Sequence, residues 1–127
     1  DDSLVRGTTS HKIVKMLYEA GAKEVHVRIA CPEIRYPDFY GVDMPTKEEL
    51  LAHNNNNKEM CDYINAKSLK FLSLEGLYKA LTGLSRNSNY PQFSDHYFTG
   101  DYPIKPSDYL NKDNITQLSL LSKTSAN

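Results

Sequence analysis

The sequence has 127 residues, of which 39% are hydrophobic and 24% are charged, and its formal net charge at pH 7 is −1. This length fits one domain with a modest core, and the composition argues against overall disorder. A nearly neutral chain has no broad electrostatic attraction to nucleic acid, and no apolar run approaches the roughly 18 residues of a membrane-spanning helix. We therefore expect a soluble globular domain without a nucleic-acid or membrane partner.

The cysteines and the N-terminus bear on the cellular compartment. Cys31 and Cys61 stand apart without a paired spacing, and no basic flank followed by an apolar stretch opens the chain. We predict two reduced thiols in a cytoplasmic protein.

The first half of the chain has the order of elements of an α/β protein. After a predicted loop over residues 1–10, Ile13, Met16, Leu17 and Ala20 recur at helical spacing, and Gly21 is placed to end that helix. The segment EVHVRIAC then alternates between apolar and polar residues, which predicts a strand. Loop, helix, turn and strand in this order predict the α/β fold class, with a parallel sheet and flanking helices.

The rest of the chain continues this pattern and then loses it. Residues 31–45 contain three prolines and a glycine, which predicts an irregular loop. The elements expected next are a helix over 46–53 starting at the capping-box pair Thr46 and Glu49, a helix over 58–64, a strand over 68–73, and a helix over 74–84 capped by Ser73. We attribute the asparagine run 54–57 to compositional bias.

The C-terminal quarter carries weaker signals. We predict a packed turn or short strand in the aromatic stretch HYFTGDYP. Residues 1–103 are expected to form the domain, and residues 104–127 a polar, partly disordered tail. A parallel sheet needs a strand ahead of the first loop, and two strands cannot form a doubly covered sheet. We therefore expect an α/β domain truncated at its N-terminal side, whose preceding strand lies outside this sequence.

The opening string DDSLVRGTTS holds the strongest chemical signal. Ligands of open α/β sheets bind outside the carboxyl ends of the strands, where this loop is expected. Gly7 lets the backbone turn into a helix, so that free N–H groups and the helix dipole favour an anion. The hydroxyl groups of Thr8, Thr9 and Ser10 add donors at the same point. This half of the string predicts a phosphate site.

The acidic half of the string suits a different group. The adjacent carboxylates of Asp1 and Asp2 repel one another and therefore favour sugar hydroxyls, Mg²⁺, or both between them. Together, the two halves predict a site for a ribose 5-phosphate. The alternative is a solvated chain end followed by an ordinary helix cap at Thr9 or Ser10.

The whole string resembles the signature of type I phosphoribosyltransferases, in which an acidic pair and the following loop hold 5-phosphoribosyl-1-pyrophosphate. Its Val-Arg-Gly-Thr-Thr-Ser form is similar to that of the glutamine phosphoribosylpyrophosphate amidotransferases. The likeness continues through residues 21–53, LKFLSLEGLYKAL and YFTGDYP, and covers roughly residues 1–103. The sequence is thus identified as the C-terminal part of a type I phosphoribosyltransferase domain.

The resemblance implies a glycosyltransferase that forms 5-phosphoribosylamine, the first committed step of purine synthesis. Ammonia released from glutamine by a glutaminase domain of the same protein, absent from this sequence, displaces pyrophosphate from C1 of the sugar. The resemblance also implies a homo-oligomer and Mg²⁺ as cofactor. We expect these 127 residues alone to have no amidotransferase activity.

The resemblance assigns substrate-binding residues by position but no catalytic residue. The assigned residues are Asp1, Asp2, Ser3, Arg6, Gly7, Thr8, Thr9 and Ser10. Asp1 and Asp2 are implied to contact the ribose hydroxyls and to help bind Mg²⁺. Residues 6–10 are implied to form the 5′-phosphate loop, which Ser3 borders.

The sequence departs from the family at one kind of site. Many relatives hold an iron–sulfur cluster with four cysteines, but three of those positions carry Asp38, Ser94 and Tyr97 here. Oxygen ligands do not replace cysteine in such clusters, so no iron–sulfur cluster is expected.

Two alternatives remain open from the sequence. One is another phosphoribosyltransferase, and the other is a regulator that keeps this fold as a ligand sensor. The residues upstream would separate them, since a glutaminase domain favours the amidotransferase and a winged helix favours the regulator.

Overall fold

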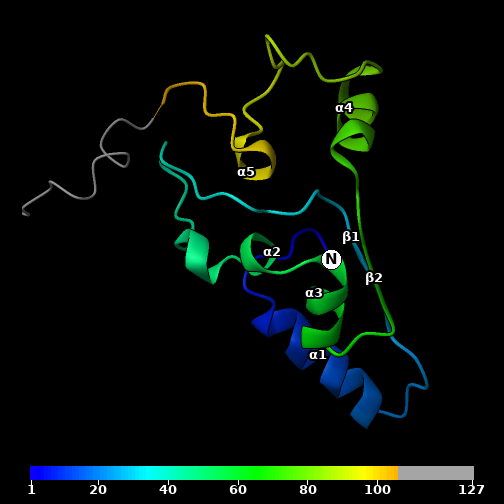
Figure 1. Ribbon diagram of the computed structural model, residues 1–127. Coiled ribbons are helices and arrows are strands. Elements are labelled where there is room, and N and C mark those ends of the chain that lie inside the picture. Colours follow the sequence, from blue (N-terminus) through cyan, green and yellow to red (C-terminus); the bar gives the residue numbers. More distant parts are fainter. Residues whose placement is uncertain (106–127) are drawn as a thin grey trace, which may run out of the picture.

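The computed structural model describes residues 1–105, so nearly all of the predicted tail lies outside the described residues. The elements are α1 (Thr8–Glu19), β1 (His26–Ile29), the 3₁₀ helix η1 (Lys47–Glu49), α2 (Leu51–Asn54), α3 (Asn57–Tyr63), β2 (Ser68–Phe71), α4 (Leu74–Thr82) and α5 (His96–Thr99) (Figure 1). Within residues 1–105, no helix has the length and apolar character needed to cross a membrane.

The two strands form a parallel sheet, as the order of elements predicted. Val27 lies opposite Leu69, and Ile29 lies opposite Phe71. Figure 1 shows α1, α2 and α3 on one side of the strands, with α4 and α5 beyond their carboxyl ends. The α/β class and the partial sheet with flanking helices are confirmed.

The core lies between the sheet and the helices on that side. The apolar residues of the alternating strand segments point into it, since Ile29 and Leu69 are only 3% and 2% exposed. The buried cluster consists of Leu4, Ile29, Leu51, Ala52, Met60, Ile64 and Leu69. Leu4 is the member that ties the candidate site loop to the core.

The helix predicted from the spacing of apolar residues is present as α1, but those apolar residues are not its buried ones. Ile13, Met16 and Leu17 are 46%, 65% and 45% exposed, whereas Val14 is buried. A helix buries only the stripe that its neighbours cover. Within residues 1–105, the covered stripe runs through Val14, one position away from the strongest periodic signal.

The caps of the later helices agree with the sequence. Ser73 accepts a hydrogen bond from the Gly76 N–H at 3.0 Å, and the Thr46–Glu49 capping box is present. The helix expected over 46–53 is instead η1 followed by the separate α2. The stretch expected to be a turn or strand contains the short helix α5, which ends at Gly100 in the left-handed region.

Side chains of the asparagine run make hydrogen bonds to the backbone, which the interpretation as compositional bias did not predict. The Asn56 side chain accepts from the Glu59 N–H at 3.0 Å and so caps α3. The Asn55 side chain donates to the Leu51 carbonyl at 2.8 Å. These bonds satisfy backbone groups at the junction of two short helices, where regular partners are missing.

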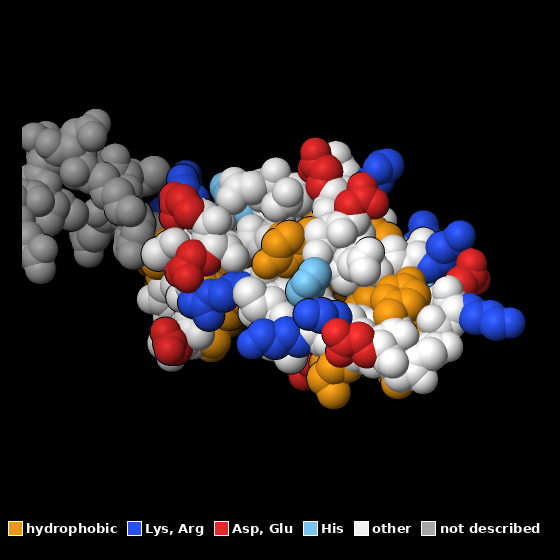
Figure 2. All heavy atoms as spheres, turned by 90° about the horizontal axis from the view of Figure 1, so that it is seen from below, with side chains coloured by type: hydrophobic (Ala, Val, Ile, Leu, Met, Phe, Trp, Pro, Cys, Tyr) orange, Lys and Arg blue, Asp and Glu red, His pale blue; other side chains and the backbone are white. Residues whose placement is uncertain are grey.

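The surface seen in Figure 2 carries mixed charges. Lysine and arginine side chains alternate there with aspartate and glutamate, and apolar groups are scattered between them.

Candidate functional site

Backbone hydrogen bonds place the first residue at the edge of the sheet. The Asp1 nitrogen donates to the Arg28 carbonyl at 2.9 Å, and the Ala30 N–H donates to the Asp1 carbonyl at 2.9 Å. One residue bonded to both neighbours of Ile29 is the pattern of parallel pairing. The Ile29 carbonyl itself accepts from the Leu72 N–H, on the β2 side. Asp1 therefore lies at the carboxyl end of β1, on the edge opposite β2.

Residues 1–10 surround one concave site of about 380 Å³. The structure thus brings together all eight residues that the sequence assigned to substrate. Five of them have exposed side chains, while Ser3 is half-buried and both Gly7 and Ser10 are buried. A polar, open concavity at the carboxyl ends of parallel strands is the usual position of a ligand in such folds.

The two leading carboxylates are partly held by the backbone. One oxygen of Asp1 accepts from the Asp2 N–H at 3.0 Å, and one oxygen of Asp2 accepts from the Ser3 N–H at 2.7 Å. Each carboxylate keeps a second oxygen for a ligand. No three potential metal-ligating side chains cluster within the described residues. The pair fits Mg²⁺ in its common setting, where one or two carboxylates share the ion with substrate phosphates.

The loop turns into α1 at Gly7. Gly7 is the N-cap, with φ of 77°, and its carbonyl accepts from the His11 N–H at 2.9 Å. The N–H groups of Thr8, Thr9 and Ser10 precede this bond at the positive end of a 12-residue helix. The alternative of a cap at Thr9 or Ser10 is therefore wrong, because both residues already lie within the first turn.

A larger residue in place of Gly7 would force its neighbours to move. A Cβ atom there would lie 2.7 Å from Leu51 Cδ2 and 2.9 Å from Tyr63 Cε1. The left-handed φ adds a second reason for glycine. Side chains from α2 and α3 thus limit the space available to the loop at Gly7.

Glu49 is a contributor to the site that sequence reasoning missed. Arg6 Nε donates to Glu49 Oε1 at 3.1 Å, across 43 positions of the chain. Hydrogen bonds from the Arg6 side chain and the Thr46 N–H lower the pKa of Glu49. The capping-box pattern explained Glu49 as a helix residue, and no spacing signal links it to Arg6.

A neighbouring thiol lies close to the acidic pair. Burial and the charge of Asp2 raise the pKa of Cys31, the second residue after β1. Its Sγ donates to the Pro32 carbonyl at 3.2 Å. A thiol held protonated at neutral pH is a poor nucleophile, so Cys31 has a packing role.

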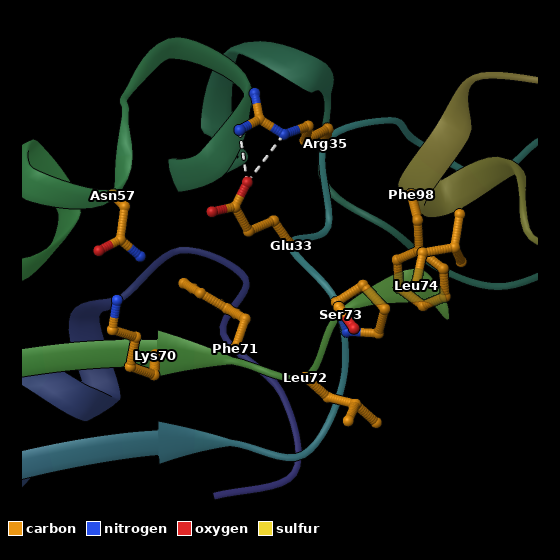
Figure 3. A pocket seen from close by; sticks show the side chains of 10 residues that line it. Glu33, Arg35, Asn57, Lys70, Phe71, Leu72, Ser73, Leu74 and Phe98 are labelled. Carbon is orange, nitrogen blue, oxygen red and sulfur yellow. Dashed lines mark hydrogen bonds and ion pairs between the residues drawn. The ribbon is translucent and has the colours of Figure 1, made fainter. Parts of the chain in front are cut away.

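A second cavity, of about 430 Å³, lies beyond the ends of β1 and β2. Figure 3 shows Glu33 and Arg35 meeting on one side of it, and Lys70 and Asn57 on another. Arg35 Nε donates to Glu33 Oε2 at 3.0 Å, and its Nη2 is paired with the same oxygen. Arg35 therefore keeps fewer donors for an anion than Arg6, whose bond to Glu49 uses Nε alone.

Asp38 and Ser94, two of the positions at which the sequence analysis expected no cluster ligand, lie in a polar network with His96. His96 Nε2 lies 2.7 Å from Asp38 Oδ1, and both side chains are 1% exposed. The second Asp38 oxygen accepts from the N–H groups of Tyr40 and Val42 at 2.9 and 2.7 Å. Ser94 Oγ lies 3.3 Å from His96 Nδ1. These side chains do not fit a cluster, since hydrogen bonds occupy both Asp38 oxygens and no thiolate is among them.

Aromatic rings enclose this network. The ring centroids of Tyr40, Tyr97 and Tyr102 lie 5.1, 4.0 and 5.0 Å from that of His96. Burial raises the pKa of Asp38, but the hydrogen bonds from Val42, Tyr40 and His96 outweigh it and leave this pKa lowered. The network joins residues 37–42 to α5.

The chain is similar to amidophosphoribosyltransferases both in sequence and in structure. No protein-family model matches the chain. The amidophosphoribosyltransferase of Rhizobium etli is 54% identical over 123 residues, which are 96% of this chain and 25% of that protein. Amidophosphoribosyltransferase 2 of Arabidopsis thaliana, described as chloroplastic, is 53% identical over 85% of this chain and 18% of its own length.

A solved structure of glutamine phosphoribosylpyrophosphate amidotransferase from B. subtilis, complexed with ADP and GMP, superposes with a TM-score of 0.72. It is 50% identical and covers 81% of this chain and 22% of that chain. The chain therefore spans a quarter or less of the length of these relatives.

Proposed function

The chain belongs to the amidophosphoribosyltransferase family, of which it represents one part, and from this premise we propose that residues 1–10 hold 5-phosphoribosyl-1-pyrophosphate in the whole enzyme. In the proposed reaction, the nitrogen of ammonia bonds to C1 of the sugar as the bond from C1 to the pyrophosphate oxygen breaks. The ammonia comes from glutamine, through a glutaminase domain of the same protein.

The loop geometry is the observation that supports this proposal most directly. Within ten consecutive residues, one concave site combines two exposed carboxylates, an arginine, and a helix N-terminus that no side chain caps. The two ends of the loop differ in charge, which suits a ligand with hydroxyls at one end and a phosphate at the other.

Each group has a distinct part in the proposal. The N–H groups and hydroxyls of Thr8 and Thr9, with the Arg6 guanidinium, bind the 5′-phosphate. The carboxylates of Asp1 and Asp2 accept from the ribose hydroxyls and would hold Mg²⁺. When bound, Mg²⁺ would neutralise charge on the pyrophosphate leaving group. The loop's contribution to rate is orientation of C1 toward the incoming nitrogen.

Further proposals concern the whole protein. We propose a cytoplasmic homo-oligomer without an iron–sulfur cluster, and the Asp38–His96 network supports the last point. We also propose that this segment alone has no amidotransferase activity, because it spans a quarter or less of the length of its relatives. An iron and sulfide assay on the full-length protein tests the absence of a cluster.

Calorimetry on the full-length protein tests the central proposal. Wild type is titrated with 5-phosphoribosyl-1-pyrophosphate in the presence of Mg²⁺, beside a variant that combines Asp1→Asn and Asp2→Asn. We expect the variant to bind at least about 10-fold more weakly, because the asparagines lose the charge needed for Mg²⁺ and accept weaker bonds from hydroxyls.

The matched control is Asp43→Asn, which removes one exposed carboxylate outside the loop. We expect its affinity to equal that of wild type. Equal affinity of the double variant and wild type, or no binding to wild type, would contradict the proposal.

A further inference from the structure

The segment from η1 to α2 supports the candidate phosphate loop at three consecutive residues. The Leu51 N–H donates to the Val5 carbonyl at 2.9 Å. Glu49 accepts from Arg6, and the Leu51 side chain fills the space behind Gly7. Each of residues 5–7 of the loop thus contacts Glu49 or Leu51.

The Arg6–Glu49 contact occupies only the Nε end of the guanidinium. Glu49 Oε1 accepts from Nε, so the two terminal nitrogens of the guanidinium stay available for a ligand. The other carboxylate oxygen, Oε2, accepts from the Thr46 N–H at 3.2 Å. Both oxygens of Glu49 are therefore engaged, which fixes the carboxylate plane and with it the direction of the Arg6 side chain.

Fold stability does not account for this ion pair. The Arg6 and Glu49 side chains are 53% and 48% exposed, and exposed pairs of this kind contribute little to folding. A long arginine side chain loses much rotamer freedom when it binds a ligand, and a partner that orders it beforehand removes part of that cost.

We propose that Glu49 is a positioning residue that orders Arg6 for the phosphate of the substrate. This inference rests on the proposed function and adds a residue to it that lies outside the contiguous loop. Glu49 acts through Arg6 and does not touch the substrate. Its negative charge opposes the phosphate, so the benefit comes from orientation and not from electrostatic attraction.

Steady-state kinetics of the full-length enzyme test the proposal through Glu49→Ala and Glu49→Gln. We expect Glu49→Ala to raise KM for 5-phosphoribosyl-1-pyrophosphate about 3- to 10-fold, the cost of ordering one long side chain, with little change in kcat. Glu49→Gln keeps an acceptor for Nε and is expected to restore KM to about the wild-type value.

Two further variants separate positioning from a general effect on the fold. Lys47→Ala changes an exposed side chain of η1 and leaves the Arg6–Glu49 bond and the Thr46 cap in place, and we expect its KM to match wild type. Arg6→Lys keeps the positive charge but has no Nε–H. Adding Glu49→Ala to Arg6→Lys is therefore expected to cause no further rise in KM, because neighbours that act together are not additive.

Several results would overturn the proposal. They are an unchanged KM in Glu49→Ala, the same rise in Lys47→Ala, no rescue by Glu49→Gln, or an added rise in the double variant. If Glu49→Ala does not fold, Glu49→Gln and Arg6→Lys still decide, because a wild-type KM in Arg6→Lys also contradicts it. Failure of the proposed function has a different signature, in which wild type neither binds nor turns over the phosphoribosyl substrate.

Discussion

The loop over residues 1–10 and the network around His96 are built in opposite ways. The loop is a contiguous, open stretch whose donors are backbone N–H groups and whose main side-chain bond, Arg6–Glu49, is half-exposed. The network pairs Asp38 with His96 across 58 positions, and both side chains are almost fully buried.

This difference separates binding from stability. Exposed groups with unused donors can exchange water for a ligand at little cost to the fold. Buried polar groups must find partners within the protein, because an unpaired one costs the full loss of its hydration. We infer that substitutions in the loop change ligand affinity, while substitutions in the network change the free energy of unfolding.

The largest effect is expected from Asp38→Ala. The change leaves His96 buried without its carboxylate and also removes the acceptor of the Tyr40 and Val42 N–H groups. Breaking a buried pair in this way costs about 3–5 kcal/mol, so a clear fall in the Tm of the full-length protein is expected.

Asp38→Asn is the conservative control for that variant. It keeps one acceptor oxygen in the same shape, and we expect a smaller fall in Tm. If Asp38→Ala leaves Tm unchanged while weakening ligand binding, the division between the two regions is wrong.

Gly7→Ala is expected to have a smaller effect on stability and a strong effect on binding. The new Cβ meets Leu51 and Tyr63 below 3 Å, and overpacking costs about 1–3 kcal/mol. Because the loop must shift to relieve the contact, affinity for the phosphoribosyl substrate is expected to fall more than Tm does.

Gly21→Ala provides the matched comparison for Gly7→Ala. Gly21 also has a positive φ, of 96°, but a Cβ there meets nothing within 4 Å. The two variants share the backbone strain and differ in the clash. Calorimetry should find a loss of affinity in Gly7→Ala alone, and an equal loss in both would assign the effect to the backbone.

The smallest effect concerns acid stability. Burial raises the pKa values of Asp38 and Asp95, but their hydrogen bonds outweigh it and leave both lowered. A lowered folded pKa gives stability above the ordinary aspartate pKa of about 3.9, and this stability is lost as pH falls through the folded value.

The test compares the Tm of wild type and Asp38→Asn from pH 6 to pH 3. We expect wild type to be more stable at pH 6, and the difference to shrink below about pH 4, since asparagine does not titrate. A difference independent of pH would show that the charge of Asp38 is irrelevant to the network.

Local patterns were the reliable part of the sequence reasoning. Alternation predicted both strands, and the caps at Ser73 and Thr46 were found where the residue types placed them. The spacing over residues 13–20 predicted the helix α1 but not which of its residues are buried, and the stretch predicted as a packed turn or short strand contains the helix α5. Both depend on which neighbours pack against a segment, and periodicity carries no information about that.

The amino-acid order by itself determined the α/β class and predicted a ligand loop at the end of a strand, whereas the eight substrate residues were assigned by resemblance to a family. The class and the loop follow from hydrogen bonds, backbone dihedrals and side-chain periods that involve residues close together in the chain. Only the tertiary structure decided that Glu49 holds Arg6, that Leu51 and Tyr63 shape the loop behind Gly7, and that Asp38 meets His96. Those contacts arise when the packing of the core brings distant segments together, and no local interaction specifies them.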